Sequence, residues 1–149
     1  TAYQKIYQAE TADEFHMEEY DFIIDAIDSL KDKADLILRA TALPKEITFI
    51  SSMCAALRRD PFMVRKAEFW KVDGDPLARA LRKKFKKNKT FPRRKFQCVY
   101  SEEKPMQNQG ENCEYSSTKA QINGSLCHIT ATFGMAIAGM VINHIIDKN

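Results

Sequence analysis

Two aspartates in the run DAIDS, from Asp25 to Ser29, give the sharpest chemical signal in the sequence. They follow the apolar run YDFII, which is typical of a strand buried on both faces of a parallel sheet. In open α/β sheets ligands bind beyond the carboxyl ends of the strands, where carboxylates can hold Mg²⁺ and, through it, the phosphates of ATP. The alternative is structural: Asp25 ends the strand, and Asp28 or Ser29 caps the next helix.

A basic tract, RALRKKFKKNKTFPRRKF at residues 79–96, gives a second signal. It carries ten basic residues and no acidic residue between Arg79 and Lys95. Lysine and arginine neutralise phosphates, and interleaved phenylalanines can stack on unpaired bases, so nucleic acid is the leading partner. The alternatives are a solvated surface for the charges and core packing for Phe85 and Phe96. The residues expected to contact nucleic acid are Arg82, Lys83, Lys86, Lys87, Lys89, Arg93 and Arg94.

The remaining polar and aromatic residues carry weaker signals. The four cysteines, at positions 54, 98, 113 and 127, have neither the spacing of a zinc site nor that of a redox CxxC motif, which favours reduced thiols in the cytoplasm. Trp70 is expected in the core, His16 in solvent, and His128 and His144 in packing or capping roles. No segment resembles the phosphate-binding patterns GxGxxG or GxxxxGKS.

The pattern of the chain predicts one α/β domain over residues 1–149. Strands are expected at 2–8, 20–26, 46–52, 63–72 and 95–101, helices at 30–43 and 76–87, and a flexible loop at 103–124. Thr11 and Glu14 could form a capping box for a short helical turn. Residues 126–146 contain no Asp, Glu, Lys or Arg and approach the length of a membrane span, but their His, Thr and Asn residues favour a buried C-terminal helix and no membrane partner.

Several motifs, taken in order, resemble an enzyme superfamily. YDFIIDAIDSLKDKADLI resembles the acidic strand-end motif of the ubiquitin-activating-enzyme-like adenylating proteins, the ThiF family. ITFISSMCAALRRDP, GDPLARALRKKFKK, CVYSEE and GSLCHITATFG resemble one branch of it, the tRNA threonylcarbamoyladenosine dehydratases. The match runs from Tyr20 to Ile146, so the expected fold is the C-terminal part of a Rossmann-like nucleotide-binding fold, with a mixed sheet and a long C-terminal helix.

The resemblance implies a cytoplasmic, homodimeric enzyme with ATP and Mg²⁺ as cofactors. It would activate the carboxylate of threonylcarbamoyladenosine in tRNA, which then cyclises with loss of AMP. Asp28 matches the family aspartate near Mg²⁺ and the ATP phosphates, so it is the expected catalytic residue and metal ligand. Asp25 matches its companion, for which cofactor binding and a structural role are both open. Cys54 stands where the family usually has glycine, and a Cβ atom there would disfavour a positive φ.

The family's glycine loop and ribose-binding acid lie upstream of this match. The chain is therefore expected to be a C-terminal portion without independent adenylation activity. Two other functions remain open: activation of a ubiquitin-like or sulfur-carrier protein, and a non-catalytic RNA-binding module in which DAIDS is only a helix cap.

Overall fold

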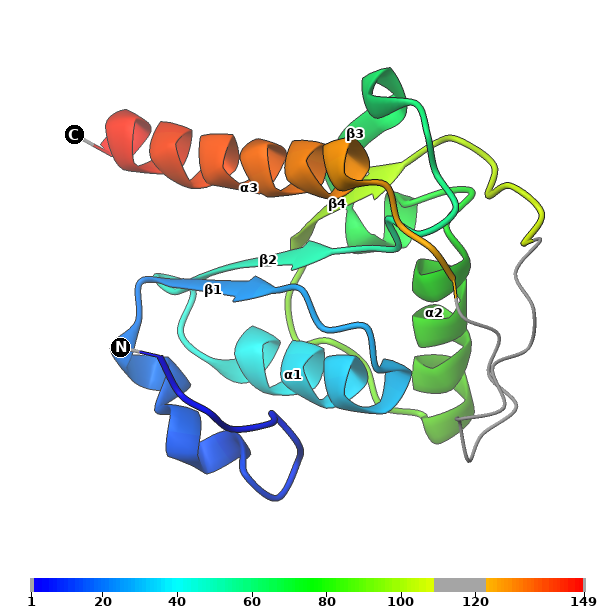
Figure 1. Ribbon diagram of the computed structural model, residues 1–149. Coiled ribbons are helices and arrows are strands. Elements are labelled where there is room, and N and C mark those ends of the chain that lie inside the picture. The colour runs from blue at the N-terminus through cyan, green and yellow to red at the C-terminus, as the bar shows by residue number, and fades with distance from the viewer. Residues whose placement is uncertain (1, 109–122, 149) are drawn as a thin grey trace.

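The computed structural model describes residues 2–108 and 123–148, which form a four-stranded sheet with helices on both faces (Figure 1). The strands lie in the order β1-β2-β4-β3; β1, β2 and β4 are parallel, and β3 is antiparallel to β4. The strands are β1 (Phe22–Asp25), β2 (Thr48–Ser52), β3 (Val64–Glu68) and β4 (Gln97–Ser101). The helices are α1 (Leu30–Ala42), α2 (Pro76–Asn88) and α3 (Cys127–Lys148), with short 3-10 turns η1 (Ala12–Phe15), η2 (Met17–Glu19), η3 (Pro61–Met63) and η4 (Phe69–Lys71).

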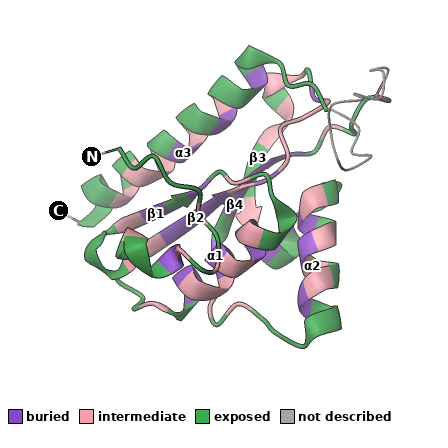
Figure 2. Ribbon diagram, turned by 60° about the horizontal axis from the view of Figure 1, so that its bottom comes forward, coloured by how far each residue is buried: buried purple, intermediate pink, exposed green. Residues whose placement is uncertain are grey.

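Two hydrophobic cores lie on opposite faces of the sheet. Helices α1 and α2 cover one face and α3 crosses the other (Figures 1 and 2). Because successive residues of a strand point to opposite faces, Phe49 and Cys98 pack in the larger core and their neighbours Ile50 and Val99 pack under α3. The predicted mixed α/β sheet with a long C-terminal helix is confirmed.

Helices α1 and α2 both begin at a side-chain cap, and that of α1 is one of the two predicted candidates. The Ser29 hydroxyl accepts a hydrogen bond from the Asp32 N–H at 3.4 Å, so Ser29, and not Asp28, caps α1. Asp75 accepts from the Ala78 N–H at 2.8 Å, with Pro76 at the first position of α2. These caps fix where each helix starts relative to the sheet edge.

Helix α3 is not the buried helix that its composition predicted. Among its 22 residues, the buried ones are Ile129, Phe133 and Ile137. They pack on β2 and β4, while Ile24 on the outer strand β1 remains 42% exposed, so that β1 is not covered on both faces as expected. By length and composition alone, α3 is also apolar enough to cross a membrane.

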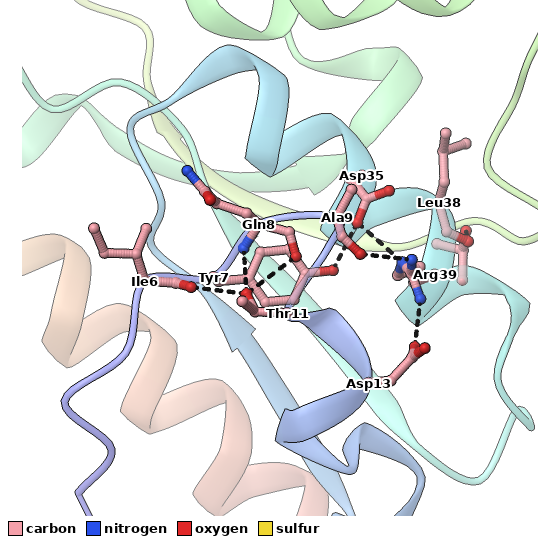
Figure 3. Close-up of polar contacts among 10 residues, drawn as sticks. Ile6, Tyr7, Gln8, Ala9, Thr11, Asp13, Asp35, Leu38 and Arg39 are labelled. Carbon is pink, nitrogen blue, oxygen red and sulfur yellow. Dashed lines mark hydrogen bonds and ion pairs between the residues drawn. The ribbon is translucent and has the colours of Figure 1, made fainter.

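The expected strand at residues 2–8 is absent, because these residues form no strand. Tyr7 contacts α1 instead, and its hydroxyl donates to Asp35 at 3.0 Å. Figure 3 shows how Arg39 of α1 holds the residues that follow this segment, donating to Asp13 at 2.7 Å and to the Ala9 carbonyl at 3.1 Å. The Thr11 hydroxyl donates to the Ile6 carbonyl and accepts from Gln8 N–H, so the capping box does not form. Hydrogen bonds that involve side chains thus hold the N-terminal segment, in place of the backbone hydrogen bonds of a strand.

Candidate functional site

A cavity of about 620 Å³ opens at the carboxyl ends of β1 and β2. It is lined by residues 26–28 after β1, residues 52–56 after β2, Leu77 at the start of α2, and the first turns of α3. This is the position at which open parallel sheets bind their ligands. The two chain segments singled out in the sequence, DAIDS and the loop around Cys54, therefore meet in one place.

Asp28 is the exposed carboxylate of this cavity. Because Ser29 provides the cap of α1, the Asp28 side chain is not needed by the helix. Among residues 2–108 and 123–148 it makes no hydrogen bond or ion pair. It is therefore available to a ligand or a cation.

Asp25 has a different role, because it is fully buried and its oxygens are occupied. Its Oδ2 accepts from the Ser51 hydroxyl at 2.6 Å and lies 2.8 Å from Nζ of Lys33. Its Oδ1 accepts from the N–H of Ile27 at 3.0 Å, and Lys33 also donates to the Ile27 carbonyl at 3.0 Å. These contacts fix the turn that carries Asp28 and correspond to the structural alternative for Asp25.

Lys33 is the residue of this network that sequence reasoning missed. It lies on the buried face of α1, four residues before Ile37, and is 0% exposed. The available signal was a lysine on the apolar face of the predicted helix, in its first turn and eight residues after the aspartate that ends the preceding strand. A buried lysine requires a partner, and the strand-end carboxylate is the nearest candidate.

A second buried ion pair supports the other wall of the cavity. Asp75 Oδ2 accepts from the Cys54 N–H at 3.2 Å and lies 3.9 Å from a guanidinium nitrogen of Arg58. Burial raises the pKa of Asp75, against the lowering effect of the Ala78 and Cys54 N–H groups and of Arg58. Asp75 therefore joins the loop after β2 to the start of α2. Arg58, also missed in the sequence, is fully buried, and its guanidinium nitrogens have no hydrogen-bond partner within the part of the chain that the structure describes.

Cys54 fits this loop without backbone strain. The non-glycine residues with positive φ, within 2–108 and 123–148, are His16, Leu57 and Lys89, so Cys54 does not have the positive φ that a Cβ atom would disfavour. Leu57, at φ 59°, is the left-handed residue of the loop. Burial raises the pKa of the half-buried Cys54 thiol, which lowers its thiolate fraction and opposes a nucleophilic role.

The structure divides the basic tract into anchoring and exposed residues. Arg82 donates to the carbonyls of Phe69 and Val72, at 3.0 and 2.8 Å. Arg94 donates to three backbone carbonyls at the end of α1 and before β2, those of Ala40, Pro44 and Ile47. Phe85 and Phe96 are buried, as their core alternative predicted. The exposed basic residues of the expected set are Lys83, Lys86, Lys87, Lys89 and Arg93.

Two of the three histidines have the places expected of them, whereas His128 is exposed and contacts a loop carbonyl instead of packing or capping. His16 is exposed. A ring nitrogen of His128 lies 2.9 Å from the Arg59 carbonyl, and His144 packs edge-on against Phe22. Cys113 lies outside the described residues. Within the described part of the chain, no group of three or more His, Cys, Asp or Glu residues could form a metal cluster.

Parallel strands with a carboxylate at a cavity beyond their carboxyl ends define a Rossmann-like α/β ligand-binding class. No protein-family model matches the chain. It is 35% identical over 137 residues to a tRNA threonylcarbamoyladenosine dehydratase of Haemophilus influenzae, covering 87% of this chain and 52% of the relative. It is 31% identical over 144 residues to tRNA threonylcarbamoyladenosine dehydratase 2 of Saccharomyces cerevisiae, covering 86% of this chain and 31% of that relative.

Solved structures show the same fold. The E. coli tRNA N6-threonylcarbamoyladenosine dehydratase TcdA in complex with AMP matches with a TM-score of 0.76 at 24% identity, over 98% of this chain and 56% of that one. Its complex with ATP matches with a TM-score of 0.73. The resemblance seen in the sequence is confirmed: the chain is related to the tRNA threonylcarbamoyladenosine dehydratases and spans about half the length of the first of these relatives.

Proposed function

We propose that this chain is the C-terminal part of a cytoplasmic, ATP-dependent enzyme that adenylates and cyclises threonylcarbamoyladenosine in tRNA. The observation that carries the proposal is the free carboxylate of Asp28 at the sheet-edge cavity, in a chain whose relatives bear this enzyme name. Structural neighbours of that name are complexes with ATP and AMP, which supports a nucleotide as the ligand. The sheet edge is proposed as its place because open parallel sheets bind ligands there.

Asp28 is proposed as a ligand of Mg²⁺ bound together with ATP. Magnesium in nucleotide sites keeps several waters and takes one or two carboxylates in addition to the phosphates, so a single free carboxylate fits it. When bound, the ion would neutralise phosphate charge as AMP becomes attached to the substrate carboxylate. Asp25 is left out of the ligand set, because its oxygens are already occupied by Ser51, Lys33 and Ile27.

Asp25 and Lys33 are proposed to position Asp28. The Asp25–Ile27 hydrogen bond and the Lys33–Ile27 contact fix both polar groups of the Ile27 backbone, directly before Asp28. A carboxylate held by a rigid turn binds a cation without first having to be ordered. The two aspartates of DAIDS thus have separate tasks, support for one and ligand binding for the other.

The exposed basic residues are proposed to receive tRNA. Lys83, Lys86, Lys87, Lys89 and Arg93 can neutralise phosphates regardless of sequence, while Arg82 and Arg94 hold the surface that carries them. The exposed apolar face of α3 is proposed to contact a second copy of the chain, since large apolar patches on soluble proteins mark interfaces. Its most exposed side chains are Met135, Ile142 and Ile146.

ATP–pyrophosphate exchange tests the adenylation step. It is measured on the chain alone and on a protein that joins it to the half of the Haemophilus relative that it does not match. Exchange in the joined protein is expected to fall about 100-fold or more in Asp28→Asn, because a group that stabilises developing charge contributes on this order. Asp21→Asn, at an exposed aspartate before β1, is the matched control.

Normal exchange in the Asp28→Asn variant would contradict the assignment. Absence of exchange in every form of the protein, together with retained tRNA binding, would favour the RNA-binding module instead.

A further inference from the structure

Trp70 and Phe91 form an aromatic pair on the surface, which the sequence did not predict. Trp70 was expected in the core of a strand, but β3 ends at Glu68 and Trp70 lies in the following turn, η4, where it is 40% exposed. Phe91, which follows α2, is 50% exposed. The two ring centroids are 6.3 Å apart, with the ring planes at 41°. Two partly exposed aromatic rings therefore lie side by side at the surface.

The pair rests on rigid supports. The ring of Trp70 packs edge-on against Phe69, which is fully buried in the main core, at 5.2 Å. The segment that carries Phe91 is fixed on both sides, because the Thr90 N–H donates to the Phe85 carbonyl at 3.1 Å and the Arg93 N–H donates to the Thr41 hydroxyl at 3.2 Å. Stacking on such a pair requires little ordering of the protein.

Positive charge surrounds the pair. Arg82 reaches η4 with its hydrogen bonds to the carbonyls of Phe69 and Val72, so this face of α2 lies beside Trp70. Lys86, four residues later, shares that face, and Lys89 ends the helix two residues before Phe91. Residues 69–96 contain eleven basic residues and two acidic ones, Asp73 and Asp75, of which Asp75 is buried.

We propose that Trp70 and Phe91 form a stacking site for an unpaired base of an RNA, whose neighbouring phosphates contact Lys86 and Lys89. Aromatic rings beside a positively charged groove are the usual means by which proteins bind single-stranded nucleic acid without reading its sequence. This inference rests on the proposed function, because that function makes tRNA the RNA concerned. It adds a requirement that charge alone does not impose: the bound segment is single-stranded.

Trp70 itself supplies the readout, since it is the only tryptophan in the chain. The chain is titrated with an RNA hairpin that has a single-stranded loop, and with a blunt RNA duplex of the same number of phosphates. The hairpin is expected to quench Trp70 fluorescence and to bind more tightly. The duplex is expected to bind through charge, with a similar salt dependence and without quenching.

Variants separate stacking from charge. Phe91→Ala is expected to weaken hairpin binding about 10-fold to 100-fold and to leave duplex binding unchanged, while Phe91→Tyr retains the hairpin affinity. Trp70→Ala, followed by the anisotropy of labelled hairpin, is expected to show the same selective loss. Phe62→Ala is the matched control, because Phe62 is 86% exposed and lies in η3.

Equal quenching of Trp70 by the two RNAs would overturn the stacking site, and so would an equal loss of hairpin and duplex affinity in Phe91→Ala. Either result would leave the proposed tRNA-binding surface unaffected. If neither RNA binds at low salt, both the stacking site and the proposed tRNA-binding surface are wrong. Absence of pyrophosphate exchange in the unsubstituted joined protein, with intact discrimination between hairpin and duplex, would remove the catalytic assignment alone.

Discussion

Nζ of Lys33 lies 2.8 Å from Oδ2 of Asp25, and neither side chain is exposed to solvent. The lysine joins α1 to the end of β1, directly beneath the turn that carries Asp28. Since both charges are removed from water, each depends on the other and on the Ser51 hydroxyl for compensation.

Replacing one partner of this pair is expected to be far more costly than replacing both. Lys33→Met leaves the Asp25 carboxylate buried without a counter-charge, and should lower the free energy of unfolding by about 3–5 kcal/mol. The double variant Lys33→Met/Asp25→Asn should recover part of that loss. Urea unfolding at neutral pH measures the free energy of unfolding of the single and the double variant, and Lys31→Met, on the exposed side of α1, is the control. Losses that simply add in the double variant would show that the two side chains are not coupled.

Glu103 should contribute stability that depends on pH. Its carboxylate accepts from the N–H groups of Arg59 and Asp60, at 2.9 and 3.0 Å. Desolvation raises the pKa of Glu103, but these bonds and the nearby Arg58 and Arg59 outweigh it and lower the pKa below its ordinary value of 4.5. This stabilisation is present above pH 4.5 and is lost as the pH falls through the lower pKa of the folded state.

Glu103→Gln should therefore lower stability near neutral pH and flatten the acid limb of the stability profile. Chemical unfolding at a series of pH values measures it. The exposed neighbour Glu102, in a Glu102→Gln variant, is the control. If Glu103→Gln lowers the free energy of unfolding equally at every pH, the ionisation of Glu103 does not contribute to the pH dependence of stability.

The described cysteines should react with an alkylating reagent in a fixed order. Cys127 is exposed and should react first, Cys54 more slowly, and the buried Cys98 only on unfolding. Burial raises the pKa values of both the Cys54 and Cys98 thiols, so their thiolate fractions are small at pH 8. Peptide mass mapping after timed exposure to iodoacetamide at pH 8 measures the order. Modification of Cys54 before Cys127 would show an activated thiol at the cavity.

Acidic side chains on the outer face of α3 should weaken self-association. Met135 is 75% exposed and Ile142 is 55% exposed, and burying a carboxylate at either position in an interface would be unfavourable. Met135→Glu/Ile142→Glu should raise the dimer dissociation constant about tenfold or more in sedimentation experiments. Ile6→Glu makes the same chemical change at a 75% exposed residue away from α3. An equal effect of Ile6→Glu would point to general charge repulsion.

Local signals in the sequence predicted much of this fold. The caps at Ser29 and Asp75 depend on residues within three positions, and the parallel β1-α1-β2 unit depends on hydrophobic periodicity, so both are readable from short segments. The same is true of Asp28, whose position after a buried strand places it at the ligand-binding edge of the sheet.

The features that were missed depend on contacts between distant segments. Lys33 and Arg58 are buried beside carboxylates of other elements, Asp25 and Asp75, and no local pattern in the sequence contains that information. Trp70 lies in a segment of alternating apolar and polar residues, but strand β3 ends two residues before it. Trp70 therefore lies in the turn η4, where it is partly exposed. The apolar composition of α3 indicates that the helix packs against another apolar surface. It does not indicate whether that surface belongs to this chain or to another molecule.

The outer strand β1 has a further consequence, for how the chain behaves in solution. Within residues 2–108 and 123–148 it pairs with β2 alone, so its other backbone edge is unpaired there, and Ile24 is 42% exposed on the face opposite to that of Ile23, the face that α3 crosses. Natural sheets usually protect such an edge with charges, proline or a covering element, because a free apolar strand recruits strands from other molecules. We therefore expect this edge to make the chain prone to aggregation, and Ile24→Lys to improve its solubility.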